Sequence, residues 1–374
     1  MRQKTNRIGI VMPLAHQQGG AEALFLHLLR QYSKRYTLQC VFLQEGPLVE
    51  QVRGWGYETF VIPATRLTDP LNYLSTVLAL RRWIRREKPD AVFCWMLKAH
   101  LYVGVAAILS GTRTLWFQHG ISGGGKIDRI GTRLPADRIL CCSAASQAAQ
   151  DLLPPGRPTS ICYPGVSFPS ERPLPAKESR TQLNLSPGAR IVGMVARLER
   201  WKGAHIFVEA AQIVSASLPG TYFFIVGGEH PRDPAYAEQI RQMAADSGLG
   251  EHFILAGQRP AAEVPLWQAS ADIIVHPVTG EEPFGMAVAE AMGMGRVVVA
   301  SDEGGPREII QDGVNGFLVP RGDKDALAVL LIRLLQNPDE IKRVEANAFE
   351  RGRSFSIPVF VDRVDELLAA TIAG

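Results

Sequence analysis

The chain has 374 residues, of which 46% are hydrophobic and 21% charged, a composition that indicates a globular protein and excludes a disordered or fibrous one. Its length favours two domains. The formal net charge of +3 conceals an asymmetry: residues 1–180 hold 23 Lys and Arg against 12 Asp and Glu, and the remaining residues hold 17 against 25. A first half with a net charge of +11 beside a second half of −8 predicts that the first half meets an anionic partner. No nucleic-acid-binding motif occurs, so phosphorylated or membrane-bound acceptors fit this charge better than nucleic acid.

Apolar runs and cysteines limit the class of protein further. The longest nearly uncharged apolar run, residues 101–109, is far too short to span a bilayer. The apolar run 8–15 is interrupted by Pro13 and followed by a Gly-Gly loop, so we interpret it as a strand and not as a signal peptide. The five cysteines have no CxxC spacing, which predicts reduced core thiols of a cytosolic protein and not disulfides or zinc ligands. They are Cys40, Cys94, Cys141, Cys142 and Cys162.

The first predicted strand covers residues 7–12, and Gly19-Gly20-Ala21-Glu22 then opens a helix that extends to about residue 33. Two glycines let a ligand approach the backbone closely, and the free amides of the helix start favour an anion. The pattern is not GxGxxG, so it does not indicate a dinucleotide site. A turn that only connects two elements is the alternative.

Strand and helix patterns then alternate, which predicts a doubly wound parallel sheet. The strand-like runs are 38–43, 58–62, 91–95, 114–118, 138–142 and 159–163. Ligands of such sheets bind at the carboxyl ends of the strands. His119 lies at such an end, before the glycine-rich loop 122–125. A hydrogen-bonded structural histidine is the alternative.

Residues 75–86 form a predicted helix with Val77, Leu80 and Ile84 on one face. The other faces carry four arginines, and Trp83 lies among them in the sequence. The arginines are Arg81, Arg82, Arg85 and Arg86. They form either a solvated face or a surface for anionic lipid headgroups or a pyrophosphate-linked acceptor. Five prolines between residues 163 and 190 then predict a linker and domain hinge.

A second alternating pattern begins at residue 191, with strands at 191–196, 222–226, 252–256, 273–276 and 297–300 and late helices at 323–335, 338–348 and 357–372. Arg197 and Lys202 follow its first strand, five residues apart, and two cations there can grip phosphate oxygens. Asp323-x-Asp325 is similar to a metal-binding acidic pair. Because it follows Gly322 and starts a helix, N-capping explains it better.

Residues 281–299 read as a loop, a helix and a strand, and the prediction of the site centres on them. Glu282 and Glu290 are eight residues apart, about two helical turns, so both can lie on one helix face. Pro283 is well placed in the first turn, whose free amides form an anion site. Carboxylates that bind hydroxyls, together with backbone amides that bind phosphates, suit a sugar nucleotide. An ordinary amphipathic helix with solvated acids is the alternative.

Four motifs occur in a fixed order. They are Gly19-Gly20-Ala21-Glu22, then Arg197-Leu198 with Lys202-Gly203, then Glu282 to Glu290, and last Gly304-Gly305-Pro306-Arg307-Glu308-Ile309-Ile310 followed by Asp312-Gly313-Val314-Asn315-Gly316-Phe317-Leu318-Val319. In this order they resemble the motifs of retaining family 4 glycosyltransferases. The resemblance covers nearly the whole chain and is strongest across residues 190–325. Gly120 follows His119 where the family often has an acidic residue, and Tyr163-Pro164-Gly165-Val166 replaces the commoner Asn-Gly-Val.

The resemblance implies the GT-B architecture, an α/β fold of two Rossmann-like doubly wound parallel-sheet domains that face each other across a cleft. We expect residues 1–165 to form the acceptor-side domain and residues 166–189 the linker. Residues 190–354 would bind the nucleotide sugar. Residues 355–374 would form a C-terminal helix that crosses back to the first domain.

The resemblance also implies roles for single residues. Arg197 and Lys202 would neutralise the diphosphate leaving group, where fixed cations and amides stabilise the developing charge by several kcal/mol, roughly 3–4 per donor. Glu290 would hold the ribose hydroxyls, while Glu282 and His119 would lie beside the donor sugar. The backbone contacts to the donor would come from Phe284, Gly285 and Met286, with Gly19 and Gly20 closing over the phosphates. No metal and no cofactor besides the nucleoside-diphosphate sugar is expected, and retention would proceed by front-face attack through an oxocarbenium-like state.

The predicted function is therefore transfer of a sugar from a nucleoside-diphosphate sugar to a hydroxyl of a lipid-linked or cell-envelope glycan, such as lipopolysaccharide. The enzyme would be cytoplasmic, with reversible contact to an anionic inner membrane face. The alternatives are a soluble glycosyltransferase with a small-molecule acceptor, a nucleotide-sugar epimerase of similar fold, and an idle carbohydrate-binding protein. The presence of both glutamates, Arg197 and Lys202 argues against the idle protein, and the lack of GxGxxG disfavours a dehydrogenase.

Overall fold

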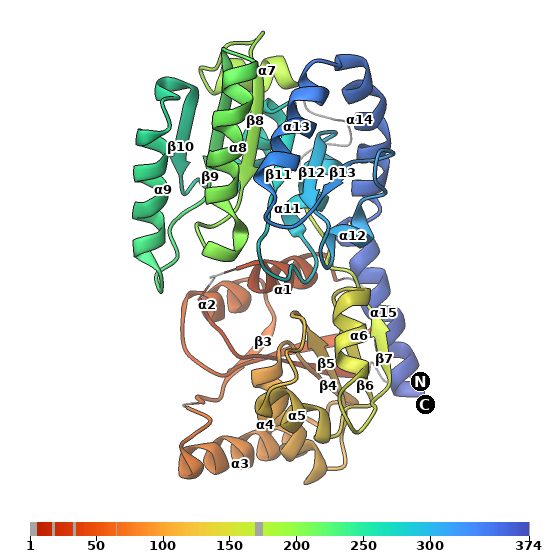
Figure 1. Ribbon diagram of the computed structural model, residues 1–374. Helices are drawn as coiled ribbons and strands as arrows, with labels where there is room; N and C mark the ends of the chain where they lie inside the picture. The colour runs from red at the N-terminus through yellow and green to blue at the C-terminus, as the bar shows by residue number, and fades with distance from the viewer. Residues whose placement is uncertain (1–5, 17–18, 33–34, 65, 169–174, 374) are drawn as a thin grey trace. The chain divides into compact units, whose positions relative to one another are not determined.

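The computed structural model describes residues 6–16, 19–32, 35–64, 66–168 and 175–373 (Figure 1). They fold into two compact units. Unit 1 holds the residues up to Gly165 together with those from Ile357 onward, and unit 2 is Val166–Ser356.

Unit 1 is built on a seven-stranded parallel sheet with the strand order β3-β2-β1-β4-β5-β6-β7. Its strands are β1 (Arg7–Met12), β2 (Thr37–Phe42), β3 (Glu58–Val61), β4 (Ala91–Cys94), β5 (Arg113–Gln118), β6 (Arg138–Cys141) and β7 (Thr159–Ile161). Its helices are α1 (Gly20–Gln31), α2 (Pro47–Gly54), α3 (Pro70–Glu87), α4 (Leu97–Ile108), α5 (Lys126–Arg133), α6 (Ala144–Asp151) and α15 (Ile357–Ala373). Apolar side chains of α1, α2 and α15 cover one face of the sheet, and those of α3 and α4 cover the other. Both faces are thus buried, which is why the strands read as near-continuous apolar runs.

The final helix, α15, packs on unit 1, which confirms that the C-terminal segment returns to the first domain. Its Asp365 carboxylate accepts a hydrogen bond of 2.8 Å from the Tyr32 hydroxyl and lies 3.0 Å from the Arg35 guanidinium. Phe360 of the same helix stacks on Phe117 of β5, with ring centroids 6.1 Å apart. The buried carboxylate and the apolar face together fix α15 against the sheet.

Unit 2 is built on a six-stranded parallel sheet with the order β10-β9-β8-β11-β12-β13. Its strands are β8 (Arg190–Val195), β9 (Thr221–Val226), β10 (Phe253–Gly257), β11 (Ile273–His276), β12 (Val297–Ser301) and β13 (Phe317–Val319). Its α-helices are α7 (Ala176–Gln182), α8 (Ala204–Ser217), α9 (Pro234–Asp246), α10 (Val264–Ser270), α11 (Met286–Gly293), α12 (Pro306–Ile309), α13 (Lys324–Leu335) and α14 (Pro338–Arg353), and the short 3-10 helices are η1 (Arg200–Lys202) and η2 (Gly250–His252). Two doubly wound parallel sheets confirm the predicted α/β class.

Several local predictions need correction. The segment 166–189, predicted as a linker, contains α7, whose buried Arg180 donates to the Ser270 carbonyl at 2.7 Å and pairs with Asp272, so part of it belongs to unit 2. Strand β13 was not predicted as a strand, and its three residues were assigned only to the last motif. Trp83 was grouped with the arginines of α3, but it is only 3% exposed and packs beneath Gly9 of the sheet.

Other local predictions are confirmed. The Asp323 carboxylate accepts hydrogen bonds from the amides of Asp325 and Ala326, so it caps α13 as expected. The five cysteines are buried thiols. Across the described ranges, no helix is both long and apolar enough to cross a membrane.

Candidate functional site

The strand order of unit 2 reverses at β8, which has β9 on one side and β11 on the other. In open α/β sheets, ligands bind outside the carboxyl ends of the strands at such a switch point. Arg197 and Lys202 follow β8, and Glu282 follows β11. The topology therefore brings Arg197 and Lys202 to the same edge of the sheet as Glu282, which is about 80 residues later in the sequence.

A glycine in a left-handed conformation places Lys202 in the site. Gly203 has φ +77° and ends η1, and a Cβ built there would lie 1.8 Å from the Pro277 carbonyl oxygen. The loop after β11 is also tied to η1 by a 2.8 Å hydrogen bond from the Thr279 amide to the Trp201 carbonyl. The two loops can approach this closely only because residue 203 has no side chain.

We expect Gly203→Ala to destabilise the protein by about 3 kcal/mol or more, since it adds a backbone clash to an unfavourable φ. Gly220→Ala is the matched control, because Gly220 has φ +78° and no atom within 4 Å of the added Cβ. The control should cost only about 1 kcal/mol. Urea unfolding of both variants measures the difference, and equal costs would show that the close approach of the two loops is unimportant.

Glu282 is the centre of a buried ionic cluster. Its Oε2 atom lies 2.5 Å from the Lys202 ammonium and 2.9 Å from Nε2 of His276. Burial opposes ionisation of Glu282, but the hydrogen bond from His276 and the charge of Lys202 outweigh it and lower the pKa of this carboxyl to about 2. Glu282 is therefore a carboxylate at any physiological pH, and it holds Lys202 in place.

The helix-face argument for the two glutamates was wrong. Helix α11 begins at Met286, with Gly285 (φ +97°) as its N-cap, so Pro283 and Glu282 lie in the preceding loop. The eight-residue spacing does not place Glu282 and Glu290 on one helix face.

Two further glycines hold this loop against the one after β12. A Cβ at Gly304 would lie 2.2 Å from the Glu282 carbonyl oxygen, and one at Gly305 would lie 2.3 Å from the backbone of Phe284. The Gly305 amide donates to the Glu282 carbonyl at 2.8 Å. The amides of Val288 and Ala289 donate to the Gly285 carbonyl at 2.9 and 3.2 Å. The earlier first-turn amides, those of Met286 and Ala287, lie at the positive end of the helix dipole, where an anion is favoured.

Glu290 lies in the second turn of α11, in a different environment from Glu282. Burial raises the pKa of the Glu290 carboxyl to about 7, and the neighbouring Gln268 amide of α10 offsets only part of this shift. This carboxyl thus changes protonation near neutral pH. The surroundings of the two glutamates of the motif therefore shift their pKa values in opposite directions.

Arg197 stands at the exposed end of the same network. Its guanidinium lies 2.6 Å from Glu199, and the Trp201 indole donates to the other Glu199 oxygen at 2.6 Å. The Lys202 ammonium lies 3.9 Å from the centroid of the Trp201 ring. A chain of contacts therefore connects Arg197 to Lys202, and the Arg197 side chain is 44% exposed and open to an anion.

The remaining predicted residues belong to unit 1. Gly19 caps α1 in extended conformation and Gly20 is its first residue. His119 follows β5 with its ring 4.1 Å from that of Phe117 and 5.2 Å from that of Trp95. Burial lowers the pKa of His119 to about 3, against a smaller opposing effect of a hydrogen bond with the Trp95 backbone. His119 is therefore neutral, which suits a hydrogen bond to a sugar hydroxyl and excludes a role as a cation at neutral pH.

Sequence reasoning missed His276 and Gln268. His276 is the last residue of a predicted strand, and the rule that singled out His119, a polar residue at a carboxyl strand end, would also have found it. Gln268 is buried in α10, where no sequence pattern relates it to Glu290.

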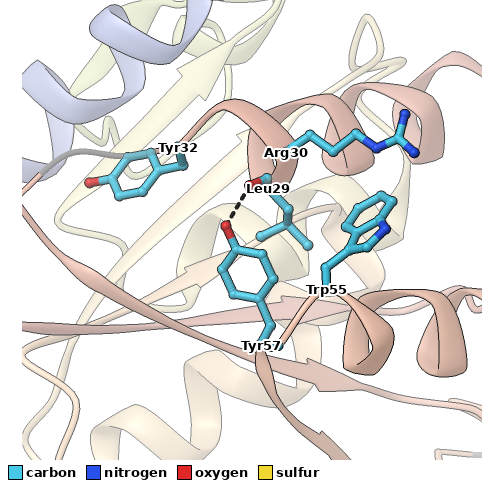
Figure 2. Close-up of a pocket in the computed structure, with 6 residues that line it drawn as sticks. Leu29, Arg30, Tyr32, Trp55 and Tyr57 are labelled. Atoms are coloured by element: carbon cyan, nitrogen blue, oxygen red, sulfur yellow. Dashed lines mark hydrogen bonds between the residues drawn. The ribbon is translucent and has the colours of Figure 1, made fainter.

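A pocket of about 280 Å³ opens elsewhere on unit 1 (Figure 2). It is lined by Leu29, Arg30, Tyr32, Trp55, Gly56 and Tyr57. The Arg30 guanidinium lies over the Trp55 ring at 4.7 Å, and Tyr57 donates to the Leu29 carbonyl. These residues end α1 and precede β3, so the pocket lies at the amino ends of the strands and contains no predicted site residue.

Comparisons with known proteins relate the chain to glycosyltransferases. The family described as "Glycosyl transferases group 1" matches residues 175–351, and "Glycosyltransferase Family 4" matches residues 18–167. A D-inositol 3-phosphate glycosyltransferase of Thermobispora bispora is 30% identical over 62% of this chain and 55% of its own length. The chain thus matches little more than half the length of that relative. The lipopolysaccharide core biosynthesis glycosyltransferase LpsE of Rhizobium meliloti is 25% identical over 95% of this chain and 97% of its own.

Solved structures show the same fold. Anabaena HepE in complex with UDP has a TM-score of 0.84 at 23% identity and covers 98% of this chain and 100% of its own. The lipopolysaccharide outer core galactosyltransferase WaaB, in its apo form, has a TM-score of 0.77 at 18% identity, over 97% and 99% of the two chains. At these identities the structures establish the fold, and the sequence families establish the class. The chain belongs to the group 1, family 4 glycosyltransferases and has the GT-B fold.

Proposed function

We propose that this enzyme transfers a sugar, with retention, from a nucleoside-diphosphate sugar to a hydroxyl of a lipid-linked or cell-envelope glycan. The observation that supports it best is the cluster of Lys202, Glu282 and His276 at the switch point of unit 2. Departure of a diphosphate develops negative charge, and Lys202 is a cation already fixed where such a group would leave. Arg197 is a second cation at the more exposed end of the network.

Each group of site residues would have a separate role in the transfer. Lys202, Arg197 and the first-turn amides of α11 would bind the diphosphate, and no proton transfer is needed for them to do so. Glu282, held ionised, would face the positive charge that grows on the donor sugar. Acceptor attack from the same face as the departing diphosphate would retain the anomeric configuration. The Phe284, Gly285 and Met286 backbone and the Gly19-Gly20 turn would complete the donor contacts.

The donor is a nucleoside-diphosphate sugar. Sugars of uridine diphosphate are the first donors to test, because HepE was solved with UDP and with UDP-glucose. Incubation of the purified protein with a panel of nucleotide sugars, followed by mass spectrometry, should show slow donor hydrolysis with one of them. Release of free sugar and nucleoside diphosphate supports a transferase. An isomerised nucleotide sugar would identify an epimerase instead, and no turnover or binding of any donor would contradict the proposal.

We infer the class of acceptor from the net charge of the first half of the chain and from the names of related proteins. The basic first half fits an anionic acceptor or surface, and LpsE and WaaB are named for lipopolysaccharide biosynthesis. We place the enzyme at the inner membrane face, in reversible contact with it. The Thermobispora bispora relative is named for a small phosphorylated acceptor, so transfer to a soluble acceptor in preference to lipid-linked glycan would favour the alternative.

We expect the affinity for free nucleoside diphosphate to weaken about tenfold between pH 8 and pH 6. If the Glu290 carboxylate holds the ribose hydroxyls, a group with a pKa near 7 must first lose its proton below that pH. The affinity for nucleoside diphosphate should then reach its highest value above pH 7 and decrease toward pH 6. Calorimetry in buffers of different ionisation enthalpy measures both the affinity and the proton released.

Glu290→Gln is the matched control for this pH dependence, because the ligand phosphate also titrates near pH 6. The variant should bind more weakly at pH 8 and keep only the part of the pH dependence that belongs to the ligand. An unchanged affinity and an unchanged pH profile would remove Glu290 from the ribose site.

A further inference from the structure

Unit 1 exposes large apolar side chains at the start of two helices. Leu71 and Leu74 of α3 are 80% and 53% exposed, and Ile127 and Ile130 of α5 are 55% and 51% exposed. Apolar side chains of this size are normally covered, and exposed groups of them beside polar residues mark interaction surfaces.

These side chains lie at the carboxyl edge of the sheet. Near the start of α3, the Thr76 hydroxyl donates to the carbonyl of Pro63, just after β3, whereas the end of α3 lies by Arg7 at the start of β1. Helix α5 begins directly after the loop that carries His119 and ends near Thr114, at the start of β5. Helix α4 packs against both α3 and α5 on the same face of the sheet (Figure 1).

The same edge is basic. Its cations are Arg66, Lys98, Lys126 and Arg129, and all but the half-buried Lys98 are exposed. The acids beside α3 and α5 are Asp69 and Asp128, and each is engaged as a cap: Asp69 accepts from the amide of Asn72, and Asp128 from the amide of Gly125. A further exposed acid of this edge, Glu45, lies in the loop between β2 and α2, and α2 covers the opposite face of the sheet. Four cations against two acids leave an excess of positive charge around the exposed apolar side chains of α3 and α5, which is typical of a surface that enters the headgroup region of an anionic bilayer.

The arginine cluster of α3 lies at the other end of that helix. Arg81 to Arg86 follow Leu71 by ten to fifteen residues, about 15–22 Å farther along the axis. The Arg81 guanidinium donates to the Leu109 carbonyl, and Arg86 pairs with Glu87. A membrane bound at the arginines would lie against the amino edge of the sheet, away from His119.

We propose that the rim formed by Leu71, Leu74, Lys126, Ile127, Arg129 and Ile130 is the surface that docks on an anionic lipid bilayer. This rests on the proposed function, and it specifies the partner: an anionic membrane at the edge of unit 1 that carries His119. The two isoleucines of α5 insert among the headgroups, and Lys126 and Arg129 hold the anionic lipids. The arginines of α3 remain in solvent.

Flotation of the full-length protein with vesicles tests this directly. Vesicles of phosphatidylglycerol with phosphatidylcholine should bind the protein, and vesicles of phosphatidylcholine alone should bind it much less. Ile127→Ser with Ile130→Ser should weaken binding about tenfold through lost apolar burial. Lys126→Gln with Arg129→Gln should weaken it roughly fivefold per charge, with a smaller effect at high salt.

The matched control replaces Arg82, Arg85 and Arg86 by Gln, which removes one more charge but leaves the rim intact. It should bind vesicles nearly as wild type. Loss of binding in this control with retention in the isoleucine variant would overturn the proposal, as would equal binding to both vesicle types or to neither. Donor hydrolysis by the same preparations reports folding and the proposed function separately, and it should be unchanged in every variant.

Discussion

Lys202→Ala is expected to lower kcat by about 10²–10³-fold, the effect typical of removing one fixed donor to a developing negative charge. Lys202 is well placed for this effect because its side chain is only 18% exposed and its ammonium is already ordered by Glu282 and the Trp201 ring. The interaction should be stronger with the departing diphosphate than with the bound donor, so kcat should fall more than the affinity for free nucleoside diphosphate. Steady-state kinetics and calorimetry on the same preparation separate the two.

Arg200→Ala is the matched control for Lys202. Arg200 belongs to the same 3-10 helix, but its guanidinium lies over the Tyr236 ring at 4.7 Å, away from Glu282. Its removal should change kcat by less than about threefold, in line with the small effects of surface substitutions. Arg197→Ala should lower kcat by an amount between those of Lys202→Ala and Arg200→Ala. The Arg197 side chain is more exposed than that of Lys202, so solvent partly screens its charge. Near-normal turnover of Lys202→Ala would remove Lys202 from the leaving-group site.

Glu282→Gln should lower kcat by about 10²-fold while changing the affinity for free nucleoside diphosphate by less than about tenfold. The amide preserves the shape of the side chain but removes the charge that pairs with Lys202 and would face the growing positive charge on the sugar. Because the pKa of Glu282 is held near 2, its ionisation should contribute no step to the pH–rate profile above pH 5. Any step near pH 7 is then assigned to Glu290 and should vanish in Glu290→Gln.

Glu281→Gln is the matched control for Glu282, since it removes a neighbouring but exposed carboxylate. It should retain wild-type kcat, and a loss equal to that of Glu282→Gln would show a general charge effect on the loop. His276→Ala tests the support of Glu282 itself. It removes the hydrogen bond that stabilises the carboxylate and should raise the pKa of Glu282 above about 2, so that the loss of kcat caused by protonation of Glu282 begins at a higher pH than in the wild type.

The class of fold could be predicted from the sequence because it depends on local periodicity. Buried strands of parallel sheets read as short apolar runs, and the alternation of such runs with helices is visible along the chain. Most predicted strands therefore agree with the structure to within one or two residues. The prediction missed the short strand β13, and it failed where composition suggested a linker but a buried Arg180 anchors α7.

The sequence by itself determined the two doubly wound sheets, the family and the motifs that carry Arg197, Lys202, Glu282 and Glu290. Only the tertiary structure decided what these residues do to one another. Lys202 and Glu282 are 80 positions apart and meet because β8 pairs with β11, and strand order is set by packing of the whole sheet, not by local pattern. The opposite pKa shifts of the two glutamates follow from the same cause: His276 and Lys202 stabilise the carboxylate of Glu282, while burial raises the pKa of Glu290 and the Gln268 amide of α10 offsets only part of that effect.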